Sequence, residues 1–188
     1  AMGGFMLMPF SSAFSVHNLG IGLDVLPHVY MITGLCSMFI GPLVGRASDR
    51  FGKFRVFFLG TLLTIVMVSI YTHLDKTPLY LVIIVNVVLF IGITSRMIPS
   101  QAIMSAIPEA RSRGAYSSIS ASLQQMAGGL GAVLSGYIVK TQPDGSIQHF
   151  EQVGYVVAVA AVFTLFMMMR IRKLVPEAPM QAVVVPSE

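Results

Sequence analysis

The chain has 188 residues, of which 55% are hydrophobic and only 11% are charged, and its mean hydropathy is +0.78. About a quarter of the residues in a soluble domain are charged, so this composition excludes an ordinary soluble protein and indicates one that lies in a lipid bilayer. The net charge of +4 does not indicate a nucleic-acid partner, because the lysines and arginines sit in short clusters between apolar runs and form no basic face. The single cysteine, Cys36, excludes a disulfide framework.

Six apolar segments follow one another along the chain, and each is close to the roughly 20 residues that a helix needs to cross the bilayer core. They cover residues 2–21, 25–47, 54–74, 78–106, 113–139 and 153–172. We therefore predict an all-α integral membrane protein with one transmembrane domain of six helices over residues 1–173. The longest connector holds the turn signal Pro143-Asp144-Gly145. The proline-interrupted residues 174–188 are predicted to form a disordered cytoplasmic tail.

The cations divide unequally between the two ends of these predicted helices. One end holds only Lys76 and Lys140. The opposite end holds nine cations, namely Arg46, Arg50, Lys53, Arg55, Arg111, Arg113, Arg170, Arg172 and Lys173. The positive-inside rule places the cation-rich end in the cytoplasm. An even number of spans then predicts that both termini are cytoplasmic.

Arg96 is the remaining cation, and it lies inside the fourth predicted span, roughly 15 Å from the cytoplasmic connector at 1.5 Å per residue. A charge at that depth is expensive and usually faces a cavity or a partner. An arginine with a long stem also reaches toward the interface in some spans. No Asp or Glu lies inside any predicted span to pair with it. Arg96 is therefore the sharpest candidate for a binding residue.

Polar side chains recur at helical spacing in the first, second, fourth and fifth segments, whereas the third and sixth are almost uniformly apolar, as expected of outer, lipid-facing helices. Amide and small polar residues also join membrane helices through hydrogen bonds, so a cavity role and a packing role are equally supported for Asn86 and Gln124. The residues predicted to line a substrate cavity are Arg96, Asn86, Gln124, Asn18, Ser15 and Tyr30. No metal-ligand spacing, nucleophile with a base or phosphate-binding glycine loop occurs, so the sequence predicts no enzyme, no metal and no cofactor.

The densest charge lies in residues 45–55, Gly-Arg-Ala-Ser-Asp-Arg-Phe-Gly-Lys-Phe-Arg, which we predict to form a short hydrophilic turn between the second and third spans. A glycine at the first position permits close helix approach, and a second one permits a tight bend. The acid is available to cap a neighbouring helix N-terminus. An ordinary basic loop would satisfy the topology without the two glycines or the Asp-Arg pair. The functional candidates in this signature are Gly45, Asp49, Arg50, Gly52, Lys53 and Arg55.

The pattern Gly-x-x-x-Asp-Arg-x-Gly-Lys/Arg-x-Arg/Lys between two spans resembles the signature loop of the major facilitator superfamily of secondary transporters. The superfamily has twelve spans, so the resemblance implies that these six form one half, built as two inverted three-helix repeats. The short tail is similar to that of the C-terminal half. Residues 96–102, Arg113-Gly114 and Gln124-Gln125-Met126 are also similar, more weakly, to the drug and sugar exporter branch of proton antiporters. That branch commonly uses an intramembrane acid, which no predicted span contains.

The resemblance implies transport by alternating access, and we expect proton-coupled efflux of drugs or small metabolites across a bacterial inner membrane. The expected partners are the bilayer, a small-molecule substrate and either an N-terminal six-helix half or a second copy of this chain, with no nucleic acid. A facilitator or symporter for sugars or organic anions is the alternative within transport, and Arg96 favours it. A non-transporting membrane scaffold or assembly module is the alternative of another class.

Overall fold

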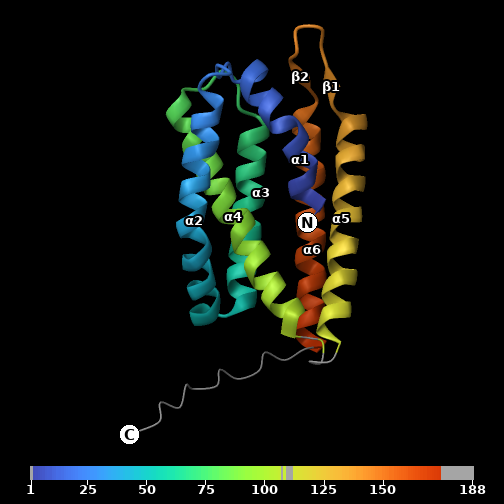
Figure 1. Ribbon diagram of the computed structural model, residues 1–188. Coiled ribbons are helices and arrows are strands. Elements are labelled where there is room, and N and C mark those ends of the chain that lie inside the picture. Colours follow the sequence, from blue (N-terminus) through green and yellow to red (C-terminus); the bar gives the residue numbers. More distant parts are fainter. Residues whose placement is uncertain (1, 107, 109–111, 175–188) are drawn as a thin grey trace, which may run out of the picture.

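The computed structural model describes residues 2–106, 108 and 112–174, and the chain folds into a bundle of helices with a small β-hairpin at one end (Figure 1). The elements in chain order are α1 (Met2–Ala13), the π-helical segment η1 (Phe14–Asn18), α2 (Leu26–Phe51), α3 (Lys53–Thr72), α4 (Leu79–Ala106), α5 (Arg113–Ile138), β1 (Lys140–Thr141), β2 (Ile147–Gln148) and α6 (Phe150–Leu174). The prediction of an all-α membrane protein is confirmed, with one antiparallel hairpin in the predicted 140–152 connector. Residues 175–188 of the predicted tail lie outside the described residues.

Several buried hydroxyls form a hydrogen bond to the backbone of their own helix. Thr33 Oγ1 donates a hydrogen bond to the carbonyl of Val29, four residues back, at 2.8 Å. Thr61 Oγ1 makes the same contact to the carbonyl of Phe57 at 2.8 Å. Such back-bonding lets buried hydroxyls sit in apolar helices without a partner on another element.

Four of the described helices, α2, α3, α4 and α6, are long and apolar enough to cross a membrane. Six spans were predicted, and the other two helices differ for separate reasons. α1 ends at Ala13, where the backbone changes to the wider winding of η1. α5 has 26 residues, but its serines, glutamines and glycines lower its hydropathy. The six helices are therefore present, whereas only four meet the criteria of length and composition for a span.

The two ends of the bundle differ in charge. Figure 1 places the end of α2, the start of α3, the end of α4, the start of α5 and the end of α6 together at the bottom, and the hairpin at the top. Arg50 and Lys53 flank the α2–α3 joint, and Arg113 begins α5, so these cations share the bottom end. Lys76 precedes α4 and Lys140 begins β1, at the opposite end. The bundle therefore has one cation-rich end.

The core lies where α3 meets α4 and α6, and α1 packs between α5 and α6. Three aromatic rings join these parts: Phe14 of η1 lies 4.5 Å from Phe150 of α6 and 5.7 Å from Tyr71 of α3, between ring centroids. The third predicted segment, α3, is thus packed against other helices on one face, although Leu59 on its opposite face is 63% exposed.

Glycines let α3 and α4 approach closely. A Cβ placed on Gly60 of α3 would lie 2.6 Å from Ser95 Cβ of α4, and one placed on Gly92 of α4 would lie 3.1 Å from the backbone nitrogen of Thr64. Real Cβ atoms essentially never come as close as 2.6 Å, so Gly60 requires glycine for this helix contact. The contact at Gly92 is tighter than nine in ten real Cβ contacts, so a side chain there would displace Thr64. These two contacts fix which part of α3 lies opposite residues 92–96 of α4.

Candidate functional site

The joint between α2 and α3 consists of a single non-helical residue, Gly52. Its φ is +94° and its ψ is 135°, a conformation that side chains rarely adopt. The Gly52 N–H donates to the Ser48 carbonyl at 3.1 Å, and the Val56 N–H donates to the Gly52 carbonyl at 3.3 Å. The predicted hydrophilic turn over residues 45–55 is therefore wrong in extent. Helix continues through the charged residues because their side chains can extend into water while the backbone keeps its own hydrogen bonds.

Asp49 and Arg50 occupy the last turn of α2, and both are exposed. The Arg50 guanidinium lies over the ring of Phe51, with its central carbon 5.6 Å from the ring centroid. Asp49 makes no hydrogen bond or ion pair with another described residue, so the predicted cap on a neighbouring helix is not formed within this part of the chain. The reason is its outward position on α2, which leaves the acid–arginine pair available to a surface outside the described residues.

The other signature residues also face outward or meet nothing. A Cβ on Gly45 would have no heavy atom within 4 Å, so the close helix approach predicted there does not occur within the described bundle. Lys53 begins α3 and is half-buried, and Arg55 follows two residues later and is exposed. The signature thus forms a cation-rich corner whose open glycine and exposed acid have no contact in this bundle.

Arg96 lies on α4 and turns toward α3. Its guanidinium carbon is 6.0 Å from the ring centroid of Phe57, a residue only 2% exposed. The Arg96 side chain is half-buried, and its Nε is buried without a hydrogen-bond partner. A cation over an aromatic ring gains some attraction but keeps its donors unsatisfied. This arginine can therefore still receive an anionic or carbonyl oxygen.

Asn86 and Gln124 have partners inside the bundle. Asn86 is buried, and its Nδ2 donates to the Val82 carbonyl of the same helix at 3.0 Å. Gln124 of α5 accepts a hydrogen bond from Gln101 Nε2 of α4 at 3.5 Å, and its own Nε2 donates to Ser120 Oγ at 3.3 Å. These amides contribute to packing between and within helices at the positions the structure gives them.

Ser15, Asn18 and Tyr30 lie toward the hairpin end. Ser15 Oγ donates to the Ser11 carbonyl at 2.8 Å and contacts the Tyr71 hydroxyl at 3.4 Å. Asn18 uses both ends of its amide on the backbone of Ile147, whereas Tyr30 is 41% exposed on α2. The predicted cavity set is therefore divided, because Ser15 and Asn18 lie near the hairpin while Arg96 lies further along α4 toward the cation-rich end.

Two groups were missed from sequence, the buried hydroxyl of Ser48 and the ring beside Arg96. Ser48 of α2 is 2% exposed, and its Oγ is buried without a partner. The ring of Phe57 lies under the guanidinium. Neither has a signal of its own, because a serine inside an apolar helix and a phenylalanine in a span are both ordinary. Only the α3–α4 contact at Gly60 and Ser95 brings the ring of Phe57 to the depth of Arg96.

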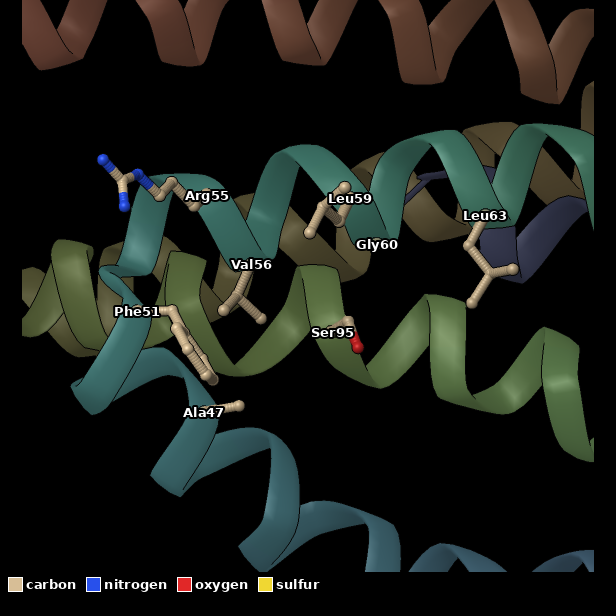
Figure 2. Close-up of a pocket in the computed structure, with 8 residues that line it drawn as sticks. All are labelled: Ala47, Phe51, Arg55, Val56, Leu59, Gly60, Leu63 and Ser95. Atoms are coloured by element: carbon tan, nitrogen blue, oxygen red, sulfur yellow. The ribbon is translucent and has the colours of Figure 1, made fainter.

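The described surface has a cleft of about 370 Å³ where α2, α3 and α4 meet beside the joint. Figure 2 shows Ala47 and Phe51 on α2 facing Val56 on α3, with Ser95 on α4 at the floor and the Arg55 guanidinium extending outward at the joint end. The lining residues are Ala47, Phe51, Arg55, Val56, Leu59, Gly60, Leu63 and Ser95. The cleft is apolar apart from the serine on its floor and the arginine at its end.

The model of the Major Facilitator Superfamily matches residues 1–185. The chain belongs to the Major Facilitator Superfamily. Neither a curated protein nor a solved structure matches it significantly. Members of this superfamily are transporters, so membership assigns the chain to membrane transport and to an integral membrane location. Among the described residues, no group of three or more His, Cys, Asp or Glu could hold a metal ion.

Proposed function

We propose that this superfamily member is one half of a secondary transporter that moves a small molecule by alternating access. The observation that carries the proposal is the outer face of α5, which runs the height of the bundle in Figure 1 and exposes Ser117, Ser122 and Gln125. Lipid offers no hydrogen bonds to an amide such as that of Gln125. This face therefore belongs against a second protein surface or a water-filled passage, and a transporter of two halves provides both.

The helix neighbours support two inverted three-helix repeats. α1 packs on α5 as α4 packs on α2, and α1 contacts α6 as α4 contacts α3. Exchanging the first three helices with the last three maps each of these pairs onto the other, and it maps the α3–α6 pair onto itself. Inverted repeats are expected to produce such an exchange. The exchange makes α1 and α4 equivalent helices, which would line the central passage with Arg96 on one of them.

A second six-helix unit is the proposed partner, either an N-terminal half or another copy of this chain. α2 supports it by exposing the large side chains of Met31, Leu35, Met38 and Phe39. In this arrangement Asp49 and Arg50 dock against helix ends of the partner and steady the outward-open state.

The orientation follows from the cation-rich end, which we place on the cytoplasmic side of a bacterial inner membrane together with the end of α6. Both termini were predicted on that side, but α1 begins partway up the bundle in Figure 1. The described acids lie in connectors or in terminal turns of helices, as Asp49 and Glu151 do. Proton-coupled efflux, our proposed activity, would therefore use a carboxylate on an N-terminal partner half, because a second copy of this chain would bring no acid inside a predicted span. Arg96 favours the second candidate, transport of an organic anion, because its buried Nε has no partner.

Vesicle transport tests the proposal. Everted vesicles from cells that express the protein in its native reading frame are energised with a proton gradient, and uptake of a fluorescent lipophilic cation is compared with that of an organic anion. Efflux predicts gradient-driven uptake of the cation, and the second candidate predicts anion movement that Arg96→Gln abolishes. Flux of neither probe under any gradient would favour a scaffold.

The signature has a matched test in the same vesicles. Asp49→Ala should depress flux without reducing the amount of inserted protein, whereas Asp75→Ala, which removes an exposed acid at the opposite end, should leave flux unchanged. Unchanged flux in Asp49→Ala would contradict the docking role. The chain on its own should be inactive or should crosslink to a second copy. Robust transport by a chain that crosslinks only as a monomer would overturn the two-half arrangement.

A further inference from the structure

The cleft between α2, α3 and α4 is long, apolar and open on one side. Its α3 wall runs from Arg55 to Leu63, about 12 Å at 1.5 Å per residue. Leu59 on this wall is 63% exposed, and Phe51 on the α2 wall is 57% exposed. Gly60 and Ser95 form the floor where α3 and α4 touch. This shape fits an extended hydrocarbon chain better than a compact solute.

The end of the cleft at the joint is cationic. Arg55 lines the cleft with its stem and extends its guanidinium outward (Figure 2). Arg50 and Lys53 flank Gly52 at the same joint, and Asp49 is the one acid of the signature. With Arg46, residues 45–55 hold four cations against this one acid, so this end has a net positive charge. Arginine also matches the geometry of a phosphate group and keeps its charge at every physiological pH.

We propose that this cleft binds one anionic phospholipid, with an acyl chain along Leu59 and Leu63 and the phosphate at Arg55. Basic pockets between membrane helices on the cytoplasmic side recognise anionic headgroups in this way. The site rests on the cleft and its charges alone, whereas its place in the cytoplasmic leaflet rests on the proposed orientation. Because the cleft spans the α2–α3 joint, a bound lipid would hold the two helices at a fixed angle.

Charge favours a lipid over the other occupants of an apolar cleft. The surfaces assigned above to a partner half are the polar face of α5, the exposed side chains of α2 between Met31 and Phe39, and the pair Asp49-Arg50. None of these residues lines this cleft. A neutral apolar solute would make no use of the guanidinium of Arg55, whereas a phosphate would form a charge-assisted contact with it. A lipid satisfies both ends, since its chain covers the exposed leucine and its phosphate meets the arginine.

Native mass spectrometry tests the site on protein purified from membranes in mild detergent and depleted of lipid. Phosphatidylglycerol, phosphatidylcholine and glycerol phosphate are titrated separately. We expect one tightly bound phosphatidylglycerol and weaker phosphatidylcholine binding. Arg55→Gln should weaken phosphatidylglycerol binding about fivefold, the effect of one cation near a membrane surface. Arg113→Gln removes an exposed cation from α5 at the same end and should change nothing.

A second variant tests the chain-binding part of the cleft. Ala47→Phe fills the cleft from α2 and should abolish binding of both lipids, and its melting temperature reports whether the bundle still folds. If it does not fold, Leu59→Gln, at an exposed position, should weaken both lipids instead. Equal binding of the two lipids, an equal loss in Arg113→Gln, or full binding in a folded Ala47→Phe would overturn the site. Competition by glycerol phosphate alone would also overturn it, because it would show a phosphate site without a lipid chain.

Discussion

Asn18 and Ile147 exchange two hydrogen bonds across 129 positions of sequence. Asn18 Nδ2 donates to the Ile147 carbonyl at 2.9 Å, and the Ile147 N–H donates to Asn18 Oδ1 at 2.9 Å. β2 pairs with β1, and the Asn18 amide bonds to the Ile147 backbone in the way that a further strand would. These two bonds connect the end of η1 to the hairpin between α5 and α6. Since α1 is one of the proposed passage helices, this tie limits how far its outer end can move from α6.

Replacing Asn18 with alanine should loosen the hairpin and destabilise the bundle by about 1–3 kcal/mol, because it leaves the Ile147 N–H and carbonyl unsatisfied. Hydrogen exchange at the Ile147 amide should become faster, and the melting temperature in detergent should fall. Gln148→Ala, an exposed change on the same strand, is the control and should alter neither measurement. Equal exchange in the two variants would show that the tie is not needed.

The hairpin turn should also respond to acid. Asp144 Oδ1 accepts hydrogen bonds from the Ser146 N–H at 3.0 Å and the Ser146 hydroxyl at 2.7 Å, and these bonds lower the pKa of the carboxyl below its ordinary value of 3.8. A lowered pKa in the folded state means that the stabilisation is present above pH 3.8 and is lost as the pH falls through the folded pKa. Exchange at the Ser146 amide, corrected for its intrinsic pH dependence, should therefore rise in that window. Asp144→Asn should remove this dependence, and a retained dependence would assign it to another group.

The sequence predicted six helices, which are present, because apolar runs of spanning length have few other uses; only four of them are long and apolar enough to span. The predicted helix ends were inaccurate at the α2–α3 joint. Hydropathy shows where the charged residues begin, whereas the helix stops only at Gly52. The sequence marked Gly52 as a residue that permits a tight bend, but hydropathy could not show that the bend consists of this residue alone. The predicted span ends at 47 and 54 are therefore replaced by Phe51 and Lys53.

The roles of polar side chains were less predictable than the helices. Asn18 and Arg96 are both polar residues in apolar surroundings, but Asn18 is engaged with a strand that lies far along the chain, while Arg96 has an unpartnered Nε. Periodicity gives the face of a residue within its own helix and says nothing about a partner 129 positions away. The two-residue strands and η1 were missed because segments so short have no period to detect.

Gly60 should be needed for the α3–α4 contact. A Cβ there would lie 2.6 Å from Ser95 Cβ and 2.9 Å from the Ser95 backbone carbon, so Gly60→Ala should separate the helices at a cost of about 1–3 kcal/mol. Gly41→Ala on α2 is the control, because a Cβ at Gly41 would meet nothing within 4 Å. Both substitutions replace a helical glycine with alanine, so both gain the same helix propensity. The melting temperature of Gly60→Ala should fall below that of Gly41→Ala. Equal melting temperatures would contradict the close approach.

Gly52 and Gly45 should separate folding from function within the signature. Gly52→Ala forces a side chain into a backbone conformation with φ +94°, which should cost about 1–3 kcal/mol and lower the melting temperature. Gly45→Ala meets nothing within the described bundle and should leave the melting temperature unchanged. A loss of flux in Gly45→Ala at unchanged stability would locate its close contact on the partner half. If Gly45→Ala instead lowers the melting temperature of the isolated chain, Gly45 must have a close neighbour within this chain.

Arg96→Met should separate the transport role of this arginine from any role in folding. The buried Nε has no partner, so an apolar side chain of similar length should leave the melting temperature unchanged or raise it, because no satisfied buried group is lost. Flux of an organic anion should disappear. Arg96→Lys keeps the positive charge but loses the planar donors, and it should retain part of that flux. Melting temperature and flux are measured on the same variant. If Arg96→Met lowers the melting temperature strongly and leaves flux unaltered, Arg96 is a structural residue that stabilises α4 against Phe57.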